Sequence, residues 1–149
     1  MTNKIYGNFK NIVYLRNYDG DTITVNIPNV PRLIGEAVSI RVRGLDTPEI
    51  KGKTHCEKTL AKSAKLLVTH LLSTAQIDLI DTSRDKYFRI LSNVSFDGND
   101  LSRTLIKNHL AVPYDGGKKE EVDWCHKQSE FQNTEWFKQI SGDTPEHEL

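Results

Sequence analysis

The hydrophobic periodicity changes once along the chain, and this change limits the folds that are possible. Over residues 22–27 and 37–43, apolar and polar residues alternate, which is typical of half-buried strands. Over about residues 57–73 the apolar residues instead recur at helical spacing, which predicts an amphipathic helix. Strands, an inserted helix, and then further strands and helices indicate a compact α+β domain.

The other elements follow from shorter signals. Strands are expected at residues 11–15, 76–80 and 88–96, and helices after a cap at Asp100 and from residue 118 to about 140. In the 88–96 strand we expect Phe88 to share the core face with Ile90. Pro28 and Pro31 predict a loop without a central strand. Five short strands around one helix also fit a small β-barrel of the OB type.

The length of 149 residues suits one domain, with a motif-bearing core at about 11–140 and a frayed tail at 141–149. A composition of 37% hydrophobic and 27% charged residues is that of an ordinary globular protein. No apolar run approaches the roughly 20 residues that cross a bilayer, so we expect no membrane association. A monomer is also expected.

Charge is unevenly distributed although the formal net charge is zero. Residues 1–119 hold 18 Lys and Arg against 12 Asp and Glu, whereas residues 120–149 hold 2 against 8. A basic body can attract phosphates locally despite an acidic C-terminal segment. The acidic segment is equally consistent with a solvated helix and tail.

Two cysteines, Cys56 and Cys125, each stand beside a histidine. They are open to three interpretations: two unrelated thiols, a disulfide, or a Cys₂His₂ zinc site. Adjacent Cys-His pairs lack the usual zinc-ligand spacing, which disfavours the third. The compartment stays open too: secreted or periplasmic if the disulfide forms and a signal peptide has been removed, and cytoplasmic otherwise.

Acidic residues gather in two short motifs, Asp-Gly-Asp-Thr at 19–22 and Asp-Thr-Pro-Glu at 46–49. Both stand at strand ends, where loops are free to converge. Carboxylates that meet there repel one another unless a cation lies between them, and calcium accepts carboxylate and carbonyl oxygens. Each motif alone is also an ordinary turn or helix start.

Two arginines accompany these motifs. Arg41 lies in the 37–43 strand on the face opposite the core, and we expect Arg89 to face away from the core as well. A guanidinium offers a planar fork of donors that matches phosphate oxygens. Two arginines and a metal could therefore bracket one phosphodiester.

These residues resemble the staphylococcal nuclease (thermonuclease) family from about Tyr18 to Tyr114. The similarity is carried by the two acidic motifs, by Arg41 and by Asp-Lys-Tyr-x-Arg at 85–89, in the same order and at similar spacing. The resemblance implies an OB barrel with three helices. It also implies a calcium-dependent nuclease of low sequence specificity that acts on DNA, RNA or both and leaves 3′-phosphate ends.

The resemblance also assigns roles to residues. It implies that calcium is bound by Asp21, Asp46 and the Thr47 carbonyl, with Asp19 supporting the metal site from outside. It implies that Arg41, Glu49 and Arg89 are catalytic, and that Lys86, Tyr87 and Tyr114 bind substrate. In this fold the loops that carry the cysteines border the same mouth, which favours a Cys56–Cys125 disulfide.

Two other functions compete with catalysis. The first is a binding module of the same fold that does not cut, although such modules typically lack some of the charged positions that are filled here. The second is a generic OB-type single-strand binder without a metal. It would need several exposed aromatic residues on the strands, and few candidates exist beyond Tyr87 and Tyr114.

Overall fold

The protein is a five-stranded β-barrel with most of its helices at one end, which confirms the expected OB-type α+β fold. The structure, a computed structural model, describes residues 4–143. The strands are β1 Gly7–Asn17, β2 Thr22–Asn26, β3 Val38–Val42, β4 Leu45–Asp46, β5 Ile77–Arg84, β6 Ile90–Phe96, β7 Asn99–Asp100 and β8 Val112–Pro113. The helices are α1 Arg32–Gly35, α2 His55–Leu72, α3 Leu101–Lys107, α4 Trp124–Phe131 and α5 Glu135–Asp143.

Parallel pairing of β3 with β6 closes the barrel. The remaining neighbours pair antiparallel in the order β3-β2-β1-β5-β6, so each barrel strand has two partners. β1 is long enough to pair with both β2 and β5, and its register shifts near Asn11, which has a φ of 58°. Such bulges bend a strand and allow a small sheet to close on itself.

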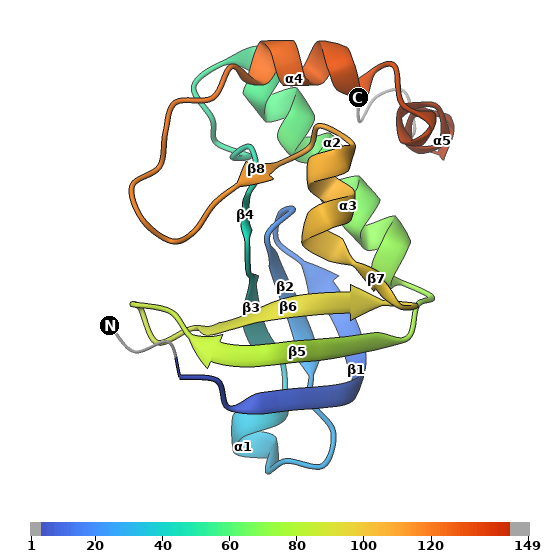
Figure 1. Ribbon diagram of the computed structural model, residues 1–149. Helices are drawn as coiled ribbons and strands as arrows, with labels where there is room; N and C mark the ends of the chain where they lie inside the picture. The colour runs from blue at the N-terminus through green and yellow to red at the C-terminus, as the bar shows by residue number, and fades with distance from the viewer. Residues whose placement is uncertain (1–3, 144–149) are drawn as a thin grey trace.

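The alternating residues predicted for the core do fill the barrel. Ile23, Val25, Ile40 and Val42 have no exposed surface, and Leu79 and Val94 join them from β5 and β6. α2 covers one end of this core with the stripe Leu60, Ala64, Leu67, Val68 and Leu72. In Figure 1 the short α1 lies at the opposite end of the barrel from α4.

The predicted helix over 118–140 is wrong in its extent. Residues 118–123 are not helical, and two separate helices, α4 and α5, follow. α4 begins where the Asp123 side chain accepts a hydrogen bond from the His126 N–H. The Thr134 hydroxyl accepts one from the Phe137 N–H at the start of α5, so capping residues divide the segment.

The structure differs from smaller expectations at Phe88 and at the end of the last helix. Phe88 is not a core residue: it is 79% exposed with a φ of 64°, because residues 85–89 form a turn before β6 begins at Ile90. The loop with the two prolines contains no strand, as expected, and it includes the short α1, which begins directly after Pro31. α5 continues to Asp143, and the expected fraying of residues 144–149 lies outside the described residues.

Among the helices of residues 4–143, none is both long enough and apolar enough to cross a membrane.

Candidate active site

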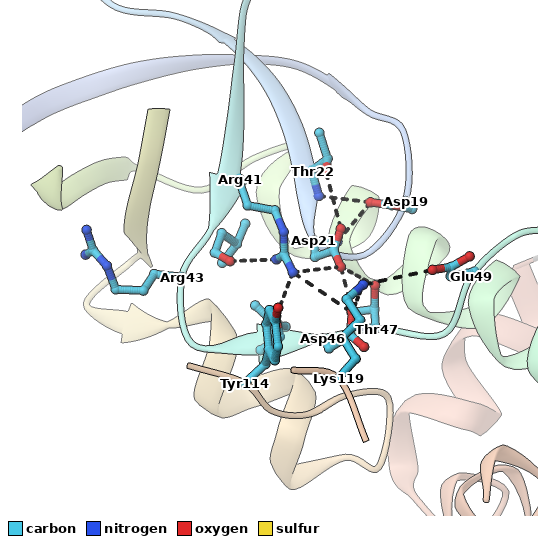
Figure 2. Close-up of polar contacts among 12 residues, drawn as sticks. Asp19, Asp21, Thr22, Arg41, Arg43, Asp46, Thr47, Glu49, Tyr114 and Lys119 are labelled. Carbon is cyan, nitrogen blue, oxygen red and sulfur yellow. Dashed lines mark hydrogen bonds and ion pairs between the residues drawn. The ribbon is translucent and has the colours of Figure 1, made fainter. Parts of the chain in front are cut away.

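The two acidic motifs and Arg41 meet at one place (Figure 2). The Asp21 carboxylate accepts a 3.0 Å hydrogen bond from the Thr47 hydroxyl. Arg41 Nη2 lies 3.5 Å from Asp21 Oδ2 and 4.0 Å from Asp46 Oδ1. The structure therefore brings together Asp21, Asp46, Thr47 and Arg41, as the sequence predicted.

The Asp19-Gly20-Asp21 turn is shaped by the Asp19 side chain. Its Oδ1 accepts the backbone N–H groups of Asp21 and Thr22 at 3.0 and 2.9 Å. Burial, together with the neighbouring Asp21 charge, raises the pKa of Asp19 to about 6. Any residue with a Cβ at position 20 would clash with the second motif, because that Cβ would lie 2.8 Å from the Thr47 side chain. The turn thus brings two carboxylates close together against the second motif.

Arg41 is held in one orientation by backbone carbonyls. Nη1 donates to the Val42 carbonyl at 2.8 Å, and Nη2 donates to the Leu45 carbonyl at 3.0 Å. The residue is only 9% exposed, although it faces away from the barrel core. A buried cation with fixed donors beside carboxylates is an electrostatic feature that needs no reorganisation when an anion binds.

Glu49 differs from the other charged groups because its side chain is 68% exposed. Its backbone is fixed instead: the Glu49 N–H donates to Glu57 Oε2 at 3.1 Å, and the Lys53 N–H donates to Oε1. Thr54 caps α2 by accepting from the Glu57 N–H. The Thr-x-x-Glu pattern at 54–57 is a capping-box signal, which indicates the start of α2 but not the bonds from Glu57 to the Glu49 loop.

Lys119 is the site residue that sequence reasoning missed. Its ammonium lies 3.1 Å from Asp46 Oδ1 and 3.9 Å from Glu49 Oε1, and 5.7 Å from the centre of the Tyr114 ring. Burial lowers the pKa of Lys119, but the hydrogen bond to Asp46 and the nearby carboxylates outweigh burial and raise it overall. Lys119 belongs to no motif, so the sequence gives no signal for this position.

Arg89 approaches the site from the turn between β5 and β6. Its Nε donates to Asp85 Oδ2 at 2.7 Å, and Asp85 Oδ1 also accepts the backbone N–H groups of Tyr87 and Arg89. Burial raises the pKa of Asp85, yet these hydrogen bonds and the Arg89 charge lower it below its usual value. Asp85 therefore stays ionised and orients Arg89.

Two neighbouring cavities share three cations, Arg41, Arg89 and Lys119. The larger, of about 860 Å³, is also lined by Lys86, Tyr87 and Tyr114, the residues predicted to bind substrate. The smaller, of about 420 Å³, contains the carboxylates of Asp19, Asp21, Asp46 and Glu49. The cations therefore stand between an acidic cavity and one with aromatic residues.

Arg43 is a further basic residue of the larger cavity. It follows Arg41 on the same face of the chain, but Figure 2 shows it pointing away from the carboxylates. Its Nη2 donates to the Ser83 hydroxyl at 2.6 Å and to the Leu91 carbonyl at 3.1 Å. Burial lowers the pKa of Arg43, although Asp81 opposes the shift.

A disulfide joins Cys56, in the first turn of α2, to Cys125, in the first turn of α4. This is one of the three arrangements that the sequence left open. Cys56 follows the loop that carries Glu49, and Cys125 follows the segment that carries Lys119. The bond therefore ties both sides of the acidic cavity together.

The oxygen atoms at the site are of the kind that hard divalent cations prefer. Within residues 4–143, no three His, Cys, Asp or Glu side chains are grouped so that they alone could hold a metal ion. A cation here would draw on the two carboxylates of Asp21 and Asp46, a backbone carbonyl and water. One member of this donor set, Asp46, already accepts a cation, because the ammonium of Lys119 lies 3.1 Å from its Oδ1.

Comparison with known proteins agrees with this architecture. The model of the Staphylococcal nuclease homologue family matches residues 39–135. Endonuclease YncB of Bacillus subtilis is 35% identical over 104 residues, which cover 68% of this chain and 46% of that protein. The SPbeta prophage-derived endonuclease YokF of the same organism is 33% identical over 99 residues, or 64% of this chain and 31% of that protein.

A fungal protein named as the probable endonuclease lcl3 of Penicillium rubens is 24% identical over 121 residues, covering 74% of this chain and 41% of its own length. The chain thus spans less than half the length of these curated relatives. More than half of the chain matches the family model, including Arg41, the second acidic motif and Arg89. The chain belongs to the staphylococcal nuclease homologue family.

Proposed function

We propose that the protein is a calcium-dependent nuclease that hydrolyses phosphodiester bonds of DNA, RNA or both. The observation that carries this proposal is the meeting of Asp21, Asp46 and Arg41 within 4.0 Å, beside an exposed Glu49. The family match and the endonuclease names of the relatives support the same reaction class.

Calcium would be held by the Asp21 and Asp46 carboxylates and the Thr47 carbonyl, with Asp19 outside. When bound, the ion supplies Lewis-acid chemistry that makes phosphorus more electrophilic. Asp19 contributes by fixing the backbone of Asp21 and by adding negative charge near the ion. The hydrogen bond from the Thr47 hydroxyl to Asp21 holds the two acidic motifs together.

Glu49 accepts the proton of the attacking water, for which its exposed carboxylate has access and freedom. The new bond joins the water oxygen to phosphorus, and the bond from phosphorus to the 5′ oxygen breaks. The leaving 5′ oxygen takes a proton from solvent, and the products are a 3′-phosphate and a 5′-hydroxyl end. Arg41 and Arg89 donate to the phosphate oxygens as negative charge builds up in the transition state.

The larger cavity binds the nucleotide next to the scissile phosphate. Lys86 supplies charge for a phosphate, and Tyr87 and Tyr114 offer aromatic faces for stacking. Stacking and phosphate contacts do not read base identity, so cleavage has low sequence specificity and single strands are favoured. The protein acts as a monomer in this proposal.

The second candidate is a non-catalytic binding module of the same fold. It is favoured by the contact of Lys119 with Asp46, which neutralises part of the acidic cavity. It is disfavoured because every charged position of the proposed reaction, including the exposed Glu49, is present.

A calcium titration with fluorescent DNA and RNA oligonucleotides separates the two. We expect cleavage that depends on calcium, stops with a chelator and leaves 3′-phosphate ends. Binding without cleavage at saturating calcium would establish the binding module instead. Cleavage that persists in excess chelator would refute the metal dependence.

A further inference from the structure

Lys119 lies within 4 Å of both carboxylates of the second acidic motif. Its Nζ is 3.1 Å from Asp46 Oδ1, a hydrogen-bonded ion pair, and 3.9 Å from Glu49 Oε1 (Figure 2). The Asp46 side chain is only 14% exposed, whereas that of Lys119 is 50% exposed. The ammonium therefore lies on the more exposed side of the Asp46 carboxylate, at the edge of the acidic cavity.

The backbone that carries Lys119 is shaped by its own turn. The Tyr114 hydroxyl donates to the Gly117 carbonyl at 2.6 Å, and the Gly117 N–H donates to Asp115 Oδ1 at 2.9 Å. Gly116 takes a φ of 95°, which suits glycine. Beyond Lys119, the disulfide at Cys125 fixes the chain to α2. The lysine is thus supplied to Asp46 at a high local concentration by a tethered segment.

Arg41 and Lys119 both lie near Asp46 but differ in how firmly they are held there. Arg41 is buried, held by two backbone carbonyls and 4.0 Å from Asp46, so it can remain when another cation arrives. Lys119 is half-exposed, and its partners within the described residues are the two carboxylates and the Tyr114 ring. It can leave Asp46 at a small cost in packing.

We propose that Lys119 is a tethered cation that competes with the metal ion for Asp46 and thereby sets the affinity of the site for calcium. This inference rests on the metal site assigned under the proposed function. The Lys119 ammonium lies 3.1 Å from Asp46 Oδ1, so an ion bound to the Asp46 carboxylate would be close to it, and the two cations would repel each other. Calcium binding therefore includes the loss of the Lys119 ion pair.

The test is the affinity for calcium alone, measured by isothermal titration calorimetry at low ionic strength without substrate. Removing the charge with Lys119→Met should tighten calcium binding by about tenfold, since a partly exposed ion pair and its repulsion of the incoming ion are lost. The matched control is Lys118→Met. Lys118 is exposed and makes no ion pair within the described part of the chain, so its variant should bind calcium as the wild type does.

A second variant separates charge from packing. Lys119→Arg keeps a cation near Asp46 and should leave the affinity within about threefold of wild type, well short of the gain expected from Lys119→Met. If Lys119→Met binds calcium with wild-type or weaker affinity, the inference is wrong. The proposal of calcium-dependent cleavage would still stand. An absence of calcium binding in all four proteins would overturn both the inference and the calcium assignment.

Discussion

The charged residues of the site differ in how firmly each is held. Arg41 is fixed by two backbone carbonyls, and Arg89 is oriented by Asp85. Asp21 accepts hydrogen bonds from both the hydroxyl and the backbone of Thr47. Glu49 has a fixed backbone, and its exposed carboxylate is 3.9 Å from the Lys119 ammonium. This division suits a site in which fixed groups bind an anion and one exposed group accepts a proton.

Glu49→Gln tests the proton-transfer role. The amide keeps the shape of the side chain but cannot accept a proton from water, so kcat should fall by about 10²–10⁴-fold. Steady-state cleavage of an oligonucleotide measures the change. Glu36→Gln is the matched control, because Glu36 pairs with Arg32 beside α1, at the far end of the barrel. Near-normal turnover in Glu49→Gln would remove Glu49 from the reaction.

Arg89→Lys tests the guanidinium fork. A lysine keeps the charge but not the paired planar donors, so we expect kcat/KM to fall by about 10²-fold. Arg103→Lys, on the exposed side of α3, provides the control. If the lysine variant cleaves as the wild type does, a point charge is sufficient and the bidentate contact is not used.

Asp19 makes the stability of the metal-free protein depend on pH. Its pKa is raised from 3.8 to about 6 on folding, so the folded chain keeps a proton that the unfolded chain loses between these values. Stability from this group is therefore lost as the pH rises from about 4 to about 6. Asp19→Asn removes the charge and keeps an acceptor for the two N–H groups.

We expect Asp19→Asn to raise the free energy of unfolding by roughly 1 kcal/mol at pH 8, a value reduced for partial solvent screening, and to have little effect at pH 4. Urea denaturation in a chelator measures both values. An equal effect at the two pH values would show that the charge of Asp19 is not the cause.

At the scale of elements, the site depends on two loops that are tied to helices. The loop from Glu49 to Lys53 is held by Glu57 of α2, and the segment before α4 is held by the disulfide. Both attachments lie in the first turn of α2. The start of this helix therefore positions Glu49 from one side and Lys119 from the other.

Replacing both cysteines, Cys56→Ser with Cys125→Ser, should lower the free energy of unfolding by about 2–4 kcal/mol. The reason is that the bond closes a loop with a sequence separation of 69 residues. Urea denaturation under non-reducing conditions gives the difference, and wild type treated with a reductant should match the variant. An unchanged unfolding midpoint would mean that the bond adds no stability to the fold.

Helices and strands were predictable where the hydrophobic periodicity is strong. They were less predictable where capping residues set the helix boundaries. Alternation identified β2 and β3, and the helical stripe identified α2, because each buries one continuous face. The division between α4 and α5 depends on the single hydroxyl of Thr134 and could not be read from apolar spacing. Phe88 was misplaced because the turn organised by Asp85 overrides its preference for a strand.

At the scale of the whole molecule, barrel closure brings distant motifs together. Parallel pairing of β3 with β6 places Arg41 beside Leu91, two residues after Arg89. The acidic motifs and both arginines could be predicted because each has a local pattern. Lys119 could not, since its position depends on a loop whose path is fixed by a distant disulfide.

The most direct test of the account is a crystal structure with calcium and an oligonucleotide that carries a non-cleavable phosphodiester analogue. We expect the ion to be bound by Asp21, Asp46 and the Thr47 carbonyl, with one phosphate contacted by both Arg41 and Arg89. An ion bound elsewhere, or a phosphate held without these arginines, would contradict the claim that the motifs form one site for phosphodiester hydrolysis.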